Sequence, residues 1–204
     1  VIPMFPEAAE SWAFLFIILG VIGIIYGALL AMIQTDIKRV IAYSSVSHMA
    51  YILVGTFTFN VYGVTGGLYQ MLNHGITIAA LFLMVGMLQE RFENLEIKKF
   101  GGVAKALPLL SVFFFVFTMS SIAVPMTNGF IGEFLILVGA YSKDPLIAYG
   151  AVLGVILGPV YMLWMFKKVF FGPQGEVIAH YCSTVHAQGA WNPHEQHMAP
   201  ASGV

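Results

Sequence analysis

The chain has 204 residues, of which 59% are hydrophobic and only 9% are charged, and its mean hydropathy is +0.85. Soluble domains carry about a quarter charged residues, so this composition excludes an ordinary soluble domain and predicts an all-α, polytopic membrane helix bundle. The net charge of −1 gives no reason to expect nucleic acid as a partner, and the single cysteine, Cys182, excludes a disulfide within the chain.

Four segments are long and apolar enough to cross a bilayer. A hydrocarbon core of about 30 Å takes about 20 apolar residues, because each residue of a helix rises about 1.5 Å. We expect these spans at residues 12–34, 40–59, 62–88 and 146–171. Residues 173–204 form a polar tail or loop after the last span.

A fifth segment, residues 106–142, is too long for one straight span and too short for two. It contains Pro125, Asn128 and Gly129, and proline and glycine interrupt helices. We therefore expect one discontinuous helix, with halves at residues 107–124 and 129–141 and with Pro125 and Gly129 as the breakers. The bundle then has about five spans, one of them broken.

Positive charge is expected on one side of the membrane. With five crossings, only Lys143 lies opposite the remaining basic residues, and the positive-inside rule places the basic side in the cytoplasm or matrix. That side carries Lys38, Arg39, Arg91, Lys98, Lys99, Lys105, Lys167 and Lys168. Two separate crossings over residues 106–142 would also leave a bias, so charge supports the orientation more than the number of spans.

Glu133 stands in this apolar, interrupted segment, about one turn after the break. A carboxylate at that depth is costly unless it faces a polar cavity, a partner charge or a bound proton. The interruption also frees backbone polar groups that must be buried in protein or line water. Glu133 is therefore a candidate proton or ion site.

Two other expected spans each carry a polar face with helical spacing. The second span carries Ser44, Ser47, His48 and Tyr51, and the third carries Gln70, Asn73, His74 and Thr77. Histidine can pass a proton near neutral pH, and its hydroxyl and amide neighbours can hold bridging waters. His74 lies about 18 Å into its span and His48 about 12 Å into its own, so we expect the deeper His74 to matter more.

Each histidine alone is as readily explained as a neutral hydrogen-bonded contact between helices. Three ionisable groups on three helices, together with a helix break, favour an ion or proton path. Asp36 and Lys38 stand at a span boundary, where anchoring at the interface is the common role. The functional alternative is an ion pair between them that holds two helices in register.

The tail carries His180, Cys182, His186, His194 and His197, whose spacing matches no tight zinc pattern. No glycine-rich nucleotide loop, P-loop or paired-cysteine motif is present. We therefore expect no metal and no cofactor in this chain.

Three separated motifs resemble one family in order and spacing. They are Asp36-Ile-Lys-Arg-Val-Ile-Ala-Tyr-Ser-Ser-Val-Ser-His48-Met, Gln70-Met-Leu-Asn-His74-Gly and Asn128-Gly-Phe-Ile-Gly-Glu133-Phe. Over residues 1–172 the chain resembles the antiporter-like membrane subunits of respiratory NADH:quinone oxidoreductase (complex I). Glutamate on the broken helix and histidine after Ser-Val-Ser resemble the type called M in bacteria and 4 in mitochondria. The family's paired glutamate and lysines on earlier helices are absent, so we expect a C-terminal fragment, with residues 1–172 as part of a proton-translocation module.

The resemblance implies proton translocation driven by electron transfer from NADH to quinone elsewhere in the complex. Glu133 would then be the exit-side proton carrier, His48 and His74 would lie on a central axis, and Lys38 would be structural or gating. Ser44, Ser47, Asn73, Thr77 and Asp36 would support the path. Met126 stands where the family usually has the glycine of Pro-Gly-Thr.

The implied partners are other membrane subunits of complex I and the lipid bilayer, with no nucleic acid. NADH and quinone would be used by the complex as a whole, in a bacterial plasma membrane or a mitochondrial inner membrane. One rival is a subunit of a multi-chain sodium/proton antiporter or a membrane-bound hydrogenase, which share this module. A rival of another class is a purely structural membrane subunit.

Overall fold

The computed structural model describes residues 4–92, 95–173, 175, 176, 178, 179, 181 and 183. In this part of the chain the structure is helical, and its one β-bridge joins Asp36 and Glu96. The helices are α1 (Pro6–Ser11), α2 (Ala13–Met32), α3 (Ile37–Phe57), α4 (Val61–Phe92), α5 (Val103–Ala106), α6 (Pro108–Ser121), α7 (Asn128–Lys143) and α8 (Pro145–Phe171). The predicted all-α membrane bundle is confirmed. Of the tail residues considered for a metal, His180, Cys182, His186, His194 and His197 lie outside the described residues.

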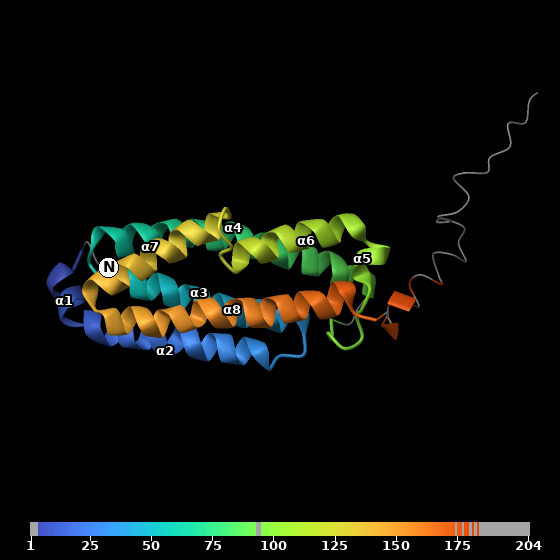
Figure 1. Ribbon diagram of the computed structural model, residues 1–204, viewed down its shortest axis with the longest axis horizontal. Helices are drawn as coiled ribbons and strands as arrows, with labels where there is room; N and C mark the ends of the chain where they lie inside the picture. The colour runs from blue at the N-terminus through green and yellow to red at the C-terminus, as the bar shows by residue number, and fades with distance from the viewer. Residues whose placement is uncertain are drawn as a thin grey trace, which may run out of the picture.

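The long helices run side by side along one axis of an elongated bundle (Figure 1). Four of them, α2, α3, α4 and α8, are long and apolar enough to cross a membrane. The half-helices α6 and α7 follow one another along the same axis and together take the place of a fifth crossing (Figure 1). The prediction that this segment forms one interrupted helix is therefore confirmed.

The expected ends of the spans shift by a few residues for local reasons. Helix α3 begins earlier than predicted because Asp36 caps it, its carboxylate accepting a hydrogen bond from the Arg39 amide at 3.2 Å. Helix α4 continues past its apolar stretch to Phe92. The residues added there include Gln89, Glu90 and Arg91, which are good helix formers.

The helix break differs from the prediction in its boundaries. Helix α6 ends at Ser121 instead of residue 124, and α7 begins at Asn128. Pro125 lies inside the break as expected, but Gly129 was wrongly predicted as a breaker because it is the second residue of α7. A Cβ at Gly129 would overlap the carbonyl oxygen of Ser120. Glycine is required there because the two half-helices approach closely, not because the chain turns at that position.

The backbone of the break is strained at Met126, whose φ is 79°. A non-glycine residue in this left-handed region costs about 1–2 kcal/mol of folding free energy. Glycine removes this strain, but its greater freedom in the unfolded chain cancels about half of the gain in stability. We therefore expect Met126→Gly to stabilise the fold by about 0.5–1 kcal/mol, seen as a higher midpoint of thermal unfolding in detergent.

The matched control is Met71→Gly, at an exposed methionine inside α4. This variant should lower the stability of the fold by about 1 kcal/mol, because glycine is a poor helix former. A lower unfolding midpoint for Met126→Gly than for the unaltered chain would contradict the assignment of strain to this residue.

Helices α3, α4 and α7 pack through glycines that leave no room for side chains. A Cβ on Gly55 would lie 2.7 Å from Cγ1 of Ile136, and one on Gly66 would lie 2.8 Å from the backbone nitrogen of the same residue. Real Cβ atoms essentially never come this close. We call this contact the glycine seam. It holds α7, which carries Glu133, directly against α3 and α4.

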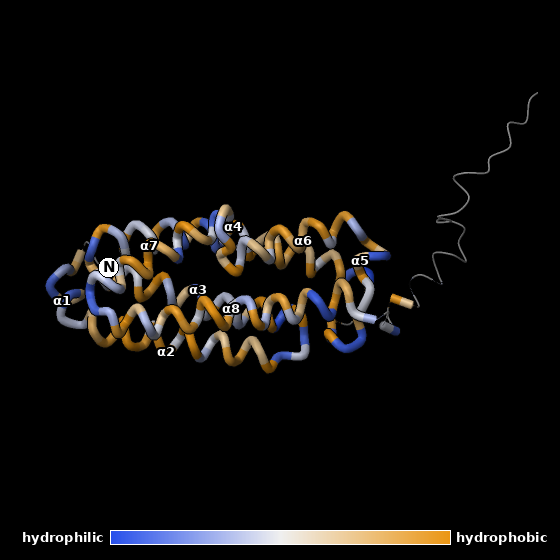
Figure 2. The backbone as a smooth tube through the Cα atoms, viewed as in Figure 1, coloured by the Kyte–Doolittle hydropathy of each residue, from blue (hydrophilic) through white to orange (hydrophobic). Residues whose placement is uncertain are grey.

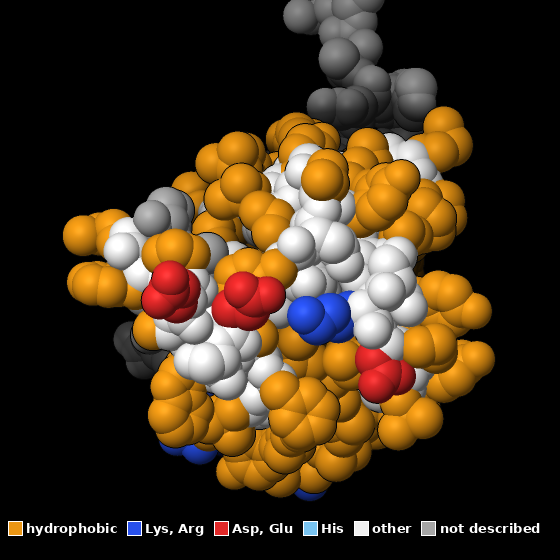
Figure 3. Space-filling view, turned by 90° about the vertical axis from the view of Figure 1, so that its left-hand side faces the viewer, with side chains coloured by type: hydrophobic (Ala, Val, Ile, Leu, Met, Phe, Trp, Pro, Cys, Tyr) orange, Lys and Arg blue, Asp and Glu red, His pale blue; other side chains and the backbone are white. Residues whose placement is uncertain are grey.

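Hydrophilic residues gather at the two ends of the bundle, whereas the long middle is mainly hydrophobic (Figure 2). The α2–α3 connection, α5 and the end of α8 lie at one end (Figure 1). Lys105 belongs to α5, and Lys167 and Lys168 belong to the last turns of α8. The opposite end holds α1 and the α7–α8 turn with Lys143. Figure 3 shows the molecule from this second end. Acidic and basic side chains lie across the middle of the face, and hydrophobic side chains surround them. The side of the membrane that each end faces stays a prediction.

Candidate functional site

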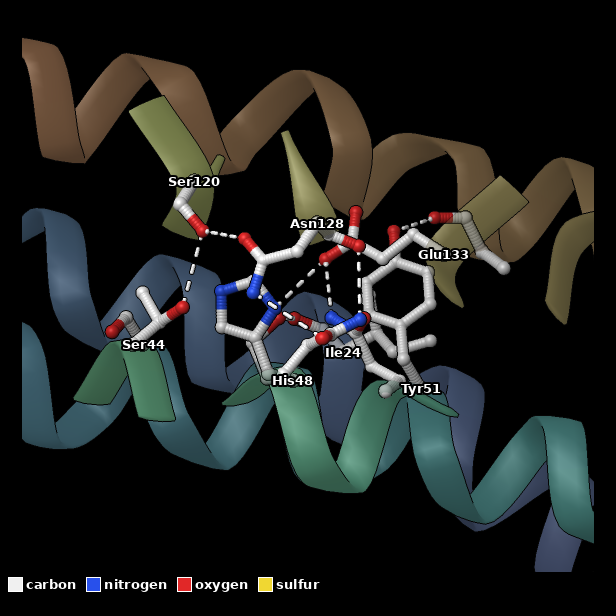
Figure 4. A network of polar contacts seen from close by, with 12 residues as sticks. Ile24, Ser44, His48, Tyr51, Ser120, Asn128 and Glu133 are labelled. Carbon is white, nitrogen blue, oxygen red and sulfur yellow. Dashed lines mark hydrogen bonds and ion pairs between the residues drawn. The ribbon is translucent and has the colours of Figure 1, made fainter. Parts of the chain in front are cut away.

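A buried carboxyl group and a buried histidine meet in the middle of the bundle. Glu133 of α7 is 5% exposed and His48 of α3 is 7% exposed. Nδ1 of His48 lies 2.9 Å from Oε1 of Glu133 (Figure 4). One proton between these atoms gives either a carboxylate paired with an imidazolium or a carboxylic acid bonded to a neutral imidazole. The pair can therefore hold a proton on either member.

His74 of α4 extends this pair. Its ring centroid lies 5.2 Å from that of His48, and its side chain is also buried. The structure thus brings together the three ionisable groups that the sequence suggested, from three helices. Because the two histidines are in contact, their depths along separate spans do not rank them as the sequence argument assumed.

Gln70 is the other polar neighbour of the carboxyl group. Its amide nitrogen donates to Oε1 of Glu133 at 3.3 Å, and the side chain is 3% exposed. His48 and Gln70 therefore converge on one carboxyl oxygen, and both donate to it when Nδ1 of His48 carries a proton. This arrangement suits an ionised carboxylate, which only accepts hydrogen bonds.

A set of hydrogen bonds, here called the break network, joins the break to α4. Ser120, in the last turn of α6, donates to Oδ1 of Asn128 (Figure 4). The amide of Asn128 donates to Oδ1 of Asn73 at 3.2 Å, and Asn73 donates in return to the backbone carbonyl of Asn128 at 2.9 Å. A second link to α4 is made where Oγ1 of Thr77 lies 3.1 Å from Oγ of Ser120. These side chains satisfy polar groups that an interrupted helix exposes inside a membrane.

Loss of the break network should loosen the break without unfolding the bundle. Asn128→Ala removes two side-chain hydrogen bonds and is expected to cost about 1–3 kcal/mol, measured as a lower midpoint of thermal unfolding in detergent. Protease or hydrogen-exchange sensitivity should rise at residues 120–130.

The matched control is Asn60→Ala, because Asn60 also links α4 to α7 through Gly139 at 2.7 Å, but at the far end of α7. In Asn60→Ala the increase in hydrogen exchange should appear at the far end of α7. Equal exchange at the break in both variants would contradict a local role for Asn128.

Other residues of the predicted polar face are engaged by backbone carbonyls. Ser44 donates to Ile41 at 2.7 Å and Ser47 donates to Ile24 of α2 at 2.9 Å. Tyr51 donates to the carbonyl of Ala151 in α8. Ser47 and Tyr51 therefore join α3 to α2 and α8 around the site, whereas Ser44 bonds within α3 (Figure 4).

The suggested ion pair between Asp36 and Lys38 is not formed. The cap geometry turns the Asp36 carboxylate back to the first turn of α3, where it accepts from the Arg39 amide. Lys38 donates instead to the side-chain oxygen of Gln89 in α4. The two helices are therefore joined at this end by a lysine–amide contact.

The site encloses a polar cavity of about 10 Å³, roughly the space for one water molecule. Its lining includes both histidines, Gln70 and Ser120. A larger cavity of about 560 Å³ between α4 and α6 is apolar and holds none of the predicted site residues, so its size does not mark it as the functional site. Among the described residues, no three His, Cys, Asp or Glu side chains lie together in a way that could hold a metal ion.

Comparison with known proteins agrees with the three motifs. A family model described as NADH:quinone oxidoreductase/Mrp antiporter, TM, matches residues 1–158. The chain belongs to this family. The resemblance inferred from the sequence is thereby confirmed.

Relatives in the family include both complex I and Mrp proteins. NADH-quinone oxidoreductase subunit M of Rickettsia prowazekii (strain Madrid E) is 50% identical over 171 residues, which are 84% of this chain and 35% of that protein. A chain of respiratory complex I from Thermus thermophilus with bound NADH superposes with a TM-score of 0.81 at 36% identity, covering 85% of this chain and 37% of its own. A chain of the Mrp complex from Dietzia sp. DQ12-45-1b superposes with a TM-score of 0.77 at 28% identity, and the match covers 81% of this chain and 31% of the Mrp chain. The chain therefore spans about a third of the length of these relatives.

Ser120 was not among the site residues predicted from the sequence. Its signal is the Ser120-Ser121 pair directly before the break, the place where freed backbone groups need partners. The pairing of Gln70 with Glu133 was also missed, although the position of Gln70 one turn before His74 placed it on the correct face.

Proposed function

We propose that this chain forms part of a proton-translocating membrane subunit of an NADH:quinone oxidoreductase. One observation carries the proposal: the buried carboxyl group of Glu133 contacts buried His48, and His48 contacts buried His74. Ionisable groups inside a membrane bundle mark ion or proton paths. The family match and the similarity to subunit M of Rickettsia prowazekii support complex I as the assembly.

The proposed proton movement follows from the geometry. A proton passes between Nδ1 of His48 and Oε1 of Glu133 across 2.9 Å, and the imidazolium and carboxylate become imidazole and acid. A positive charge that arrives near the pair stabilises the carboxylate and favours release of its proton, and departure of that charge favours uptake. Charge movements in neighbouring subunits would thereby drive the cycle.

The surroundings of the chain belong to the same proposal. NADH and quinone act in other subunits, and this chain contributes no redox cofactor. Its partners are the neighbouring membrane subunits and the bilayer of a bacterial plasma membrane or mitochondrial inner membrane. By the positive-inside rule, the basic end of the bundle faces the cytoplasm or matrix.

The test uses the assembled complex that contains the full-length subunit, purified and sealed into vesicles. NADH-driven quinone reduction should acidify the vesicle interior in sodium-free buffer, and a protonophore should remove the acidification. The subunit should co-purify with NADH-oxidising partners.

Quinone reduction without proton transport would overturn the proposal. Transport that depends on sodium, or co-purification without NADH-oxidising partners, would favour instead the multi-chain antiporter suggested by the Mrp similarity.

A further inference from the structure

One buried polar atom beside the carboxyl group has no partner. Gln70 uses its amide nitrogen to donate to Glu133, but its side-chain oxygen Oε1 has no hydrogen-bond partner among the residues that the structure describes. The side chain is 3% exposed, so bulk solvent does not compensate. A buried acceptor left unpaired is costly and therefore needs an explanation.

The packing holds Gln70 in this position. Gly132 precedes Glu133 on α7, and a Cβ there would lie 3.0 Å from Cβ of Gln70 and would overlap its Oε1. The missing side chain at residue 132 lets the amide lie against the backbone of α7. The unpaired oxygen therefore lies next to the residue that carries the acid.

The chemistry of the two groups is complementary in both protonation states of the acid. An ionised carboxylate only accepts hydrogen bonds, whereas a protonated carboxyl group adds one O–H donor. The glutamine amide carries donors on its nitrogen and an acceptor on its oxygen, and its last torsion is broad and roughly two-fold. A rotation about that torsion exchanges the group offered to Glu133.

We propose that Gln70 is a positioning residue that binds Glu133 in both states, presenting its N–H to the carboxylate and its oxygen to the acid O–H. The inference rests on the proposed function, because it assumes that Glu133 gains and loses a proton. When the proton passes from Nδ1 of His48 to Oε1 of Glu133, one N–H bond breaks and one O–H bond forms. The new O–H first points at Nδ1. When it turns away from the ring it donates a hydrogen bond to Oε1 of Gln70, and Nδ1 of the neutral imidazole is left free to accept the next proton.

The test is infrared difference spectroscopy of the assembled complex, with the carbonyl band of protonated Glu133 identified by its loss in Glu133→Gln. In the unaltered complex this band should have the position of a hydrogen-bonded acid. Gln70→Met removes both the donor and the acceptor at similar length. It should shift the band, because the acid O–H then has only Nδ1 of His48 as its acceptor, and it should lower the rate of proton transport about tenfold, as expected for the loss of one buried hydrogen bond.

Two further variants separate this role from simple packing. Gln70→His restores a donor in one tautomer and an acceptor in the other, so it should keep transport within about twofold of the unaltered complex. Gln34→Met is the matched control, because Gln34 is a half-buried glutamine of the α2–α3 connection whose side chain donates to the backbone carbonyl of Leu30, away from Glu133. It should leave both the band and transport unchanged.

A free-acid band in the unaltered complex would overturn the proposal, and this measurement does not require Gln70→Met to assemble. Normal transport with an unshifted band in Gln70→Met would also overturn it. Either result leaves the proposed function intact if Glu133→Gln stops transport. Normal transport in Glu133→Gln would instead remove the assumption on which the inference rests.

Discussion

Glu133→Gln is expected to lower proton translocation by at least about a hundredfold in the assembled complex, the scale on which positioned acids and bases act. Glutamine has nearly the same volume and can still accept a hydrogen bond from His48 through its oxygen, so packing in the bundle should be retained. It cannot take up or release a proton at this position. The measurement is acidification of sealed vesicles, recorded together with the rate of quinone reduction.

The matched control for this variant is Glu10→Gln, in the exposed part of α1 at one end of the bundle. It removes the same charge without touching the buried pair and should leave translocation unchanged. Near-normal acidification by Glu133→Gln, with the subunit fully assembled, would remove Glu133 from the proton path and favour a structural role for the buried groups.

His48→Leu is expected to have the second-largest effect. Leucine keeps an apolar volume in the bundle but leaves the Glu133 carboxyl group without the ring nitrogen that lies 2.9 Å away. Breaking one partner of a buried ion pair costs about 3–5 kcal/mol, because an uncompensated group stays behind. We expect a lower unfolding midpoint in detergent and a loss of translocation close to that of Glu133→Gln.

Two comparisons sharpen this second prediction. His74→Leu should cost less stability, because the described contact of His74 is with the His48 ring and not with the carboxyl group. The double variant His48→Leu with Glu133→Gln should recover part of the lost stability, since a neutral amide needs no charged partner. Stability losses that simply add in the double variant would contradict a direct pairing of the two residues.

The sequence predicted the helices and their polar faces because both depend on local spacing. Apolar runs of sufficient length defined the spans, and the recurrence of polar residues every three or four positions placed His48 and His74 on inward faces. The break at Pro125 was also predictable, since proline removes a helical hydrogen bond and crowds the preceding turn, although α8 continues through Pro159. Its boundaries were not, because the close approach that requires Gly129 is a contact between segments.

The contacts within the site could not be predicted from a single amino-acid sequence. Which ring nitrogen meets which carboxyl oxygen depends on how far α3, α4 and α7 are rotated and how closely they approach. Asp36 illustrates the same point, because its nearest charged neighbour in sequence suggested an ion pair and its local cap geometry decided otherwise. The three motifs compensated for this by indicating the family independently of any contact.

The glycine seam limits how the proton path can work. Gly66 brings the backbone of α4 against that of α7, and Gly55 packs α3 against Ile136 of α7, so close packing opposes displacement of these helices around Glu133. We therefore expect changes at the site to be rotations of side chains such as amides and imidazoles. Rotations of this kind are faster than the microsecond-to-millisecond displacement of whole helices. Turnover would accordingly be limited by the arrival of charge at the site and not by mechanical rearrangement of this bundle.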